Sequence, residues 1–277
     1  MENKAPMTLD ELKKEELEIL IQLDEICKKE GIRYSLAAGT LLGAIRHGGF
    51  IPWDDDIDIF LPRPDYDRLV KYCMENETPF DFLSHETNDK YTYLFAKAMS
   101  KRTVVIERNA NPYKIPLGVY VDIFPVDGMG DNLEDAKRVF KSIRFERELL
   151  IARNWTKYQK NKSRSFSYNM ARLAFYLLSR FTTPKAIMKR LKKKSKCTDF
   201  DLSAYAGCIP SAYRIKESFD IDVYKEYTKT TFEGREFSII KNYDKYLTGI
   251  YVNYMELPPE DKRITHHSFD AYYKENV

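Results

Sequence analysis

Aspartates fill four of the five positions 54–58, and no other segment of the chain restricts its fold as strongly. Their like charges repel one another, so a folded protein rarely gathers them without a counter-charge. Apolar side chains nevertheless bracket the run, namely Ile51, Trp53, Ile57, Ile59 and Phe60. The pattern therefore predicts a buried strand that carries an acidic site. A passive acidic edge is the alternative.

Alternation along a strand would place Asp54, Asp56 and Asp58 on one face and the isoleucines in the core. Two carboxylates on one face can converge on a hard cation such as Mg²⁺ (or Mn²⁺), which often keeps open positions for substrate phosphates. A calcium loop of the EF-hand kind is excluded, because it requires a glycine where Ile59 stands. We predict that Asp56 and Asp58 bind the metal, with Asp54 as a third ligand or as a residue that orients one.

A second acidic position lies in the apolar segment 119–124, where Asp122 is the single charged residue. A lone carboxylate in a buried strand is costly unless it is paired or bound to a metal. We therefore predict Asp122 as a further metal ligand. The alternative is a carboxylate satisfied by the backbone or by an arginine.

Gly39 and Thr40 precede a short helical pattern at 41–45. A glycine and a hydroxyl at a helix N-terminus leave backbone N–H groups for a phosphate. Arg46 and His47 follow in the loop before the acidic run, where a cation could neutralise a diphosphate. His47 could equally be an ordinary loop residue.

The chain has 277 residues, 43% of them apolar, which suits one large domain with a proper core. A helix at 12–30, a strand at 32–36, a glycine turn, a helix at 41–45 and a strand at 57–61 predict a mixed α/β beginning. The four cysteines form no C-x-x-C pair, which indicates reduced thiols. The polar first 16 residues and the lack of a long apolar run predict a cytoplasmic protein, with a peripheral position at the inner membrane face as an option.

Charge is unevenly distributed along the chain. Thirteen of its 45 Lys and Arg residues, and none of its 42 Asp and Glu residues, lie within 157–196. An apolar stripe at helical spacing crosses this stretch, formed by Phe166, Met170, Leu173, Ala174, Leu177, Leu178 and Phe181. A basic amphipathic helix can lie on an anionic membrane surface, which is our prediction for 157–196. The alternatives are a helix packed on its own domain with a solvated cationic face, or contact with a polyanion; nucleic acid is not expected.

The segments 34–59 and 121–127 closely resemble the hallmark of the LicD family of phosphotransferases, which includes the fukutin-related proteins. A weaker likeness occurs at 232–234 and returns at 254–259 with Arg263, His266 and His267. The resemblance covers about residues 10–128 and 225–270 and leaves the basic middle unmatched. The chain departs from the usual pattern at Val252-Asn253 and near Ile240-Lys241.

The family is similar to the nucleotidyltransferase superfamily, whose signature is a Gly-Ser/Thr turn, a D-h-D strand (h, a hydrophobic residue) and a third acid on a neighbouring strand. These match Gly39-Thr40, Asp56-Ile57-Asp58 and Asp122. The resemblance implies an α+β (mixed α/β) fold, with a nucleotidyltransferase-like core sheet, flanking helices and a helical basic insertion. We expect a catalytic core at 1–130, a helical basic region at 131–215 that contacts membrane or acceptor, and a hairpin and helix at 216–277 that complete the core.

The resemblance further implies transfer of an alcohol-phosphate, such as phosphocholine, from a CDP-activated donor to a sugar hydroxyl of a cell-surface glycan, teichoic acid or lipid-linked glycan. Asp56, Asp58 and Asp122 would hold Mg²⁺ (or Mn²⁺), while Gly39 and Thr40 would bind a donor phosphate. Further candidates for donor or phosphate binding are Arg46, His47, Lys97, Arg263, His266 and His267. The alternatives are a nucleotidyltransferase that moves a nucleoside monophosphate, a D-x-D glycosyltransferase, and a non-catalytic membrane-surface binding protein.

Overall fold

The computed structural model describes residues 5–107, 115–155, 157–196, 198–263 and 269–274. The first half contains α1 (Leu9–Glu30), β1 (Ser35–Leu36), α2 (Ala38–His47), β2 (Ile57–Pro62), α3 (Arg63–Glu75), β3 (Asp81–Leu83), β4 (Ala96–Met99), β5 (Thr103–Glu107) and β6 (Tyr120–Gly128). The second half contains α4 (Leu133–Arg153), α5 (Phe166–Arg180), α6 (Pro184–Ser195), β7 (Tyr205–Gly207), β8 (Ser218–Asp220), β9 (Tyr227–Phe232), β10 (Arg235–Ile240), α7 (Tyr243–Tyr251) and β11 (Phe269–Tyr273). Short 3₁₀ turns occupy Arg214–Glu217, Ile221–Val223 and Glu260–Lys262. The predicted α+β class is confirmed.

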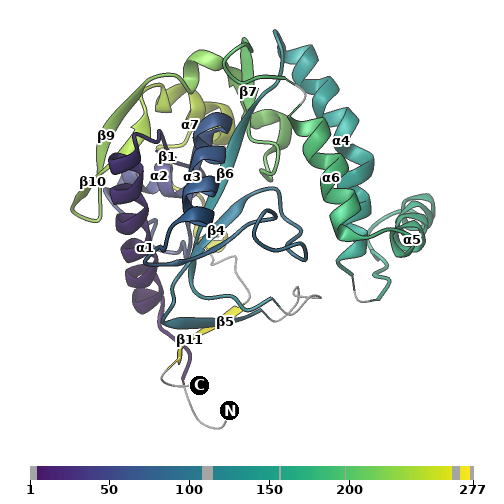
Figure 1. Ribbon diagram of the computed structural model, residues 1–277, viewed down its shortest axis with the longest axis horizontal. Coiled ribbons are helices and arrows are strands. Elements are labelled where there is room, and N and C mark those ends of the chain that lie inside the picture. Colours follow the sequence, from purple (N-terminus) through teal and green to yellow (C-terminus); the bar gives the residue numbers. More distant parts are fainter. Residues whose placement is uncertain (1–4, 108–114, 156, 197, 264–268, 275–277) are drawn as a thin grey trace.

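The main sheet is mixed, with the strand order β1-β2-β6-β4-β3, and β7 and β8 extend it from the end of β6 (Figure 1). Strands β2 and β6 run parallel, and their register pairs Asp58 with Asp122. Strand β4 runs antiparallel to β6 and pairs Lys97 with Asp122. Paired residues on neighbouring strands point to the same face of a sheet, so the topology brings these three ionisable side chains together.

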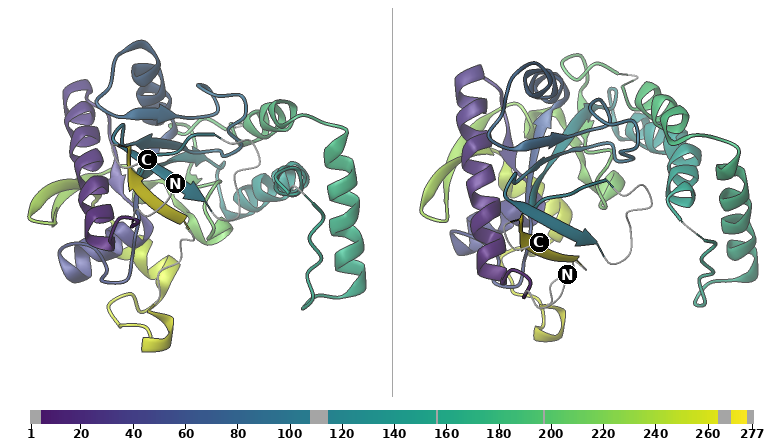
Figure 2. Two further views of the ribbon diagram at one scale, coloured as in Figure 1. Left: turned by 90° about the horizontal axis from the view of Figure 1, so that it is seen from below. Right: turned by 60° about the horizontal axis from the view of Figure 1, so that its bottom comes forward.

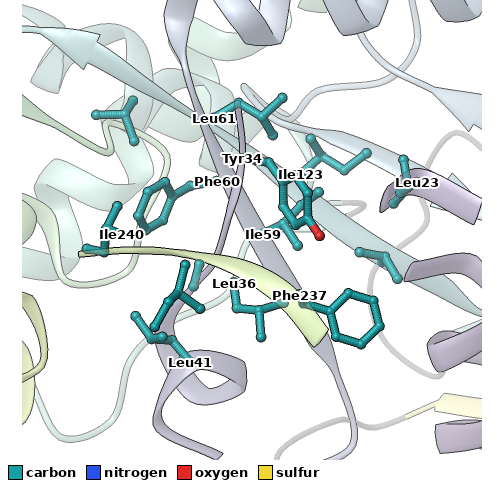
Figure 3. Packing of buried hydrophobic residues seen from close by; sticks show 14 of the residues in the cluster. Leu23, Tyr34, Leu36, Leu41, Ile59, Phe60, Leu61, Ile123, Phe237 and Ile240 are labelled. Atoms are coloured by element: carbon teal, nitrogen blue, oxygen red, sulfur yellow. The ribbon is translucent and has the colours of Figure 1, made fainter. Parts of the chain in front are cut away.

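Strand β2 is buried on both faces, which explains its apolar sequence. Ile57 and Ile59 are fully buried, as predicted, in a core that also contains Leu36 of β1 and Phe237 of β10 (Figure 3). On the opposite face Phe60 contacts the rings of Tyr224 and Tyr246, at centroid distances of 5.5 and 5.6 Å. The acids at the start of β2 are therefore attached to a strand that is packed on both faces.

Helix α1 begins and ends through the local signals seen in the sequence. Thr8 and Glu11 form a capping box, in which the Thr8 hydroxyl accepts from the Glu11 N–H and the Glu11 carboxylate accepts from the Thr8 N–H. Gly31 ends the helix at a positive φ of 60°, a conformation that glycine adopts without strain. The helix crosses beside β2 and β6, so its buried face reaches the acidic loop.

Helices α4, α5 and α6 form a separate group to one side of the sheet (Figures 1 and 2). An apolar cluster separate from the main core includes Val139 and Ile143 of α4 and Ile187, Met188 and Leu191 of α6, with Phe175 of α5 packed against it. Helix α5 lies farthest from the sheet in all three views (Figures 1 and 2). Within the described segments, no helix combines the length and apolar character required to cross a membrane. The predicted boundaries near 130 and 215 stay predictions.

Candidate active site

The acidic run lies mostly ahead of the strand, not within it. Strand β2 begins at Ile57, so the prediction that Asp54, Asp56 and Asp58 alternate along one strand is wrong for the first two. The Asp54 N–H donates to the Ile51 carbonyl at 2.9 Å and closes a turn across Pro52. Proline favours such a turn and has no N–H for a strand ladder, which explains the late start of β2. Only Asp58 projects from the strand itself.

This turn gathers three carboxylates. Asp54, Asp55 and Asp56 each offer an oxygen, and these oxygens lie within 4.8 Å of one another. Asp55, which the sequence analysis did not select, is the buried member of the three, with 5% exposure. Carboxylate oxygens gathered in this way are the ligand type preferred by Mg²⁺ and Mn²⁺.

Helix α1 contributes a fourth carboxylate that sequence reasoning missed. Glu16 is only 2% exposed, and its Oε2 has no hydrogen-bond partner among the residues that the structure describes. Burial, followed by the negative charges of Asp56 and Asp55, raises the pKa of Glu16 well above its usual value. The sequence does contain an indication of this burial, because Glu16 lies four residues after Leu12 and therefore on the apolar face of the helix.

On the sheet, Asp58 and Asp122 lie side by side, and a lysine accompanies them. Lys97 Nζ lies 2.5 Å from Asp122 Oδ1 and 3.3 Å from the centroid of the Tyr120 ring. Burial, followed by the charges of Asp56 and Asp122, raises the pKa of Asp58 well above its usual value, against the opposing effect of Lys97. Asp122 is thus paired with a buried cation of the protein, a lysine instead of the arginine considered above. Its role as a metal ligand stays a prediction.

The Gly39-Thr40 turn positions the acids. The Thr40 hydroxyl accepts from the Asp58 N–H at 2.8 Å, which fastens the start of α2 to β2. A side chain at Gly39 would have its Cβ only 2.6 Å from Asp54 Oδ2, so only glycine lets the carboxylate lie against this turn. Phosphate binding by the two residues stays a prediction.

Buried hydrogen bonds from Tyr246 and Glu217 stabilise the residue that precedes the Gly39-Thr40 turn. The Tyr246 hydroxyl donates to the Glu217 carboxylate and accepts from the Ala38 N–H at 3.4 Å. Ala38 has a positive φ of 43°, which is unfavourable for a residue with a side chain, so outside support is needed there. Burial raises the pKa of Glu217 to about 7.

This raised pKa predicts a pH-dependent stability that disappears in Glu217→Gln. The ionised carboxylate is disfavoured only in the folded state, so its cost is absent below the usual value of 4.5, grows up to about pH 7 and then stays constant. Between pH 4.5 and 8 the wild type should lose about 3 kcal/mol of unfolding free energy relative to the variant. Urea unfolding across this range measures it, and parallel pH profiles would contradict it.

The predicted cation Arg263 and His47 contact Trp53, directly before the acids, and Arg46 is hydrogen-bonded to His47. Arg46 Nη1 donates to the Tyr254 carbonyl at 2.9 Å, which ties the C-terminal segment to α2. Arg263 lies over the Trp53 ring at 5.5 Å, and His47 contacts the same ring edge-on at 6.5 Å. The structure therefore brings residues from both ends of the chain to the acidic loop.

These contacts bear on the proposed donor-binding roles. Burial, followed by the charge of Arg46, lowers the pKa of His47, and its Nε2 accepts from Arg46 Nε at 3.0 Å. His47 is therefore neutral here, and the positive charge resides on Arg46 and Arg263. Donor binding by these residues stays a prediction, and His266 and His267 lie outside the described residues.

Comparison with known proteins identifies the family of the chain. Residues 31–150 match the family described as LicD/FKTN/FKRP, nucleotidyltransferase domain. The lipopolysaccharide cholinephosphotransferase LicD of Haemophilus influenzae is 34% identical over 271 residues, which covers 92% of this chain and 94% of that protein. The ribitol 5-phosphate transferase FKRP of Homo sapiens is 53% identical over 34 residues, or 12% of this chain and 7% of that protein.

The fold, the acidic site and these relatives together define a transferase. The chain belongs to the LicD family, as its sequence motifs indicated.

Proposed function

We propose that the protein transfers an alcohol-phosphate of the phosphocholine type from a CDP-activated donor to a sugar hydroxyl of a glycan. The observation that carries the proposal is the unpartnered, buried Oε2 of Glu16 beside the carboxylates of Asp54, Asp55 and Asp56. A buried carboxylate without a partner is costly, and a divalent cation at this position would remove the cost. The relative that aligns across 92% of the chain is named a cholinephosphotransferase.

The candidate ligand atoms fit Mg²⁺ or Mn²⁺, because all of them are carboxylate oxygens. Asp54, Asp55 and Asp56 would hold the ion, with Glu16 and Asp58 facing it from α1 and β2. When bound, such an ion neutralises charge on a diphosphate. The set of Asp56, Asp58 and Asp122 predicted from sequence is thereby extended toward the loop and α1.

The chain's own groups would position the reactants. In the proposed transfer, the acceptor hydroxyl oxygen bonds to the alcohol-bearing phosphorus, and the bond from that phosphorus to the oxygen of CMP breaks. Asp122 is the proposed acceptor of the hydroxyl proton, and Lys97 holds its carboxylate in place at 2.5 Å. Arg46 and Arg263 would face the leaving CMP, and the N–H groups of Gly39 and Thr40 a phosphate.

Aromatic residues beside Lys97 favour choline as the alcohol. Phe95 and Phe124 pack at a centroid distance of 4.6 Å, and Tyr93 packs on Phe95 at 5.1 Å. Lys97 Nζ lies 5.3 Å from the Phe95 centroid, which shows that these rings share the sheet face of Asp122. Aromatic faces attract quaternary ammonium groups, whereas ribitol and glycerol carry no such charge.

The direct test is to incubate the protein with Mg²⁺, a glycan acceptor that carries free sugar hydroxyls, and CDP-choline, CDP-ribitol or CDP-glycerol, and to follow the products by ³¹P NMR. We expect CMP to appear, fastest from CDP-choline, and to appear only with the divalent cation present. A parallel incubation with CTP and phosphocholine tests the alternative, because a nucleotidyltransferase in the narrow sense would release pyrophosphate there. Pyrophosphate without CMP, or no turnover of any donor, would contradict the proposal.

A further inference from the structure

Helix α5 exposes its apolar side chains to solvent. Phe166 at its start and Phe181 just after its end are 80% and 89% exposed. Met170, Leu177 and Leu178 between them are about half exposed. Scattered exposed apolar residues are normal on protein surfaces, but a contiguous set usually marks an interaction site.

The exposed stripe lies opposite the face with which α5 packs on the protein. Asn169 and Ser179 are buried, and the Phe175 ring contacts Phe145 of α4 at 5.5 Å. At 100° per residue, these three positions fall on one side of the helix, whereas Phe166, Met170, Leu177 and Phe181 share a stripe on the other side. The apolar stripe is therefore not part of the domain's own core.

The cations of the basic stretch divide into two groups. Four of the seven cations of α6 and its end are paired within the protein, namely Lys185 with Asp89, Lys192 with Glu86, Lys194 with Glu146 and Lys196 with Asp67. Lys157, Lys160, Lys162 and Arg164, in the segment that leads into α5, are exposed. Among the described residues, none of these four makes an ion pair with an acid.

We propose that the α5 face, defined as Phe166, Met170, Leu177, Leu178 and Phe181 with the cations of 157–164, docks on a membrane surface that contains anionic lipid. The apolar stripe would enter the interface, and the adjacent lysines and arginine would lie among the anionic head groups. This docking goes beyond the proposed transfer reaction and does not depend on it.

The apolar stripe and the positive charge together favour an anionic membrane over two other partners. A polyanionic glycan or a nucleic-acid duplex would be held through its charges and would leave two phenylalanines in water. A second copy of the chain would bring the same cations face to face, because 157–196 contains no acidic residue to complement them. An anionic bilayer accommodates both the apolar stripe and the positive charge.

Vesicle co-sedimentation of the full chain tests the proposal, with phosphatidylcholine vesicles that contain or lack 30% phosphatidylglycerol. The variant F166Q/F181Q should bind anionic vesicles at least tenfold more weakly than the wild type. Its matched control M74Q/L202Q removes two apolar side chains of comparable exposure, 56% and 81%, elsewhere on the surface, and it should bind like the wild type.

A second pair of variants tests how much the positive charges contribute to vesicle binding. K160Q/K162Q should also weaken binding to anionic vesicles, and the weakening should shrink as salt is raised, whereas K29Q/K71Q should have no effect. Equal binding of neutral and anionic vesicles, or unchanged binding by F166Q/F181Q, would overturn the proposal. So would a dimer in sedimentation velocity that F166Q/F181Q abolishes without any vesicle binding by the wild type.

Discussion

Replacement of Asp58 by asparagine should lower the transfer rate by at least about 100-fold and leave the fold intact. Asp58 is the one acid of the run that projects from β2, where it is paired in register with Asp122. Burial and the neighbouring acids disfavour its ionised form, so loss of its charge should not lower the stability of the metal-free protein. The rate is measured as CMP release from CDP-choline, and stability by thermal unfolding.

The control for this variant is Asp81→Asn, an exposed aspartate on β3 of the same sheet, which should keep the full rate. Saturating Mg²⁺ should raise the unfolding temperature of the wild type and of Asp81→Asn, but not of Asp58→Asn. A folded Asp58→Asn protein with wild-type, Mg²⁺-dependent turnover would refute the role of the acidic site.

A second large effect is expected for substitution of Glu16, compared with substitution of its neighbour Glu15. Both are buried glutamates at consecutive positions of α1. Glu16→Gln should weaken Mg²⁺ binding by about 10- to 100-fold, as losses near a metal site commonly do. At a fixed Mg²⁺ concentration far above the dissociation constant, this corresponds to about 1.4–2.7 kcal/mol less stabilisation by the ion. Without the metal, the variant should be as stable as the wild type or more stable, because an unpartnered buried carboxylate is removed.

Glu15→Gln is the matched control, and it should lower stability without affecting the stabilisation by Mg²⁺. Glu15 accepts from the Ser100 hydroxyl and from Arg102 Nη2, both at 2.9 Å. Its loss should cost about 1 kcal/mol of unfolding free energy with or without Mg²⁺, and should leave the stabilisation by the ion unchanged. Thermal unfolding with and without Mg²⁺ measures both variants. Our assignment of Glu16 fails if the two variants lose the same amount in both conditions.

Local patterns in the sequence predicted much of the fold. The helix predicted at 12–30 corresponds to α1 at Leu9–Glu30, because a helix end depends on a few adjacent residues. The alternation of Ile57 and Ile59 identified the buried strand, and the apolar segment around Asp122 identified its neighbour. The hairpin of β9 and β10 lies within 216–277, where a hairpin was expected.

The parts of the site and fold that the sequence did not predict depend on contacts between distant residues, which no local sequence pattern contains. Glu16 reaches the acids only because α1 crosses beside β2, and Lys97 meets Asp122 only through the register of β4 and β6. The acidic run was assigned wholly to a strand because its flanking apolar residues resemble one, whereas the turn at Pro52 delays the strand to Ile57. Short strands such as β7 and β8 have too few residues for a pattern.

Mn²⁺ titration followed by the EPR signal of the free ion tests the central claim most directly, because it detects binding without turnover. The wild type should remove Mn²⁺ from solution with saturation, and Mg²⁺ should compete for the same site. In a D55N/D56N variant, which loses two of the three clustered carboxylates, the bound fraction should fall to the background. Wild-type titration curves from that variant, or no binding by either protein at millimolar Mn²⁺, would contradict a divalent-cation site at this acidic loop.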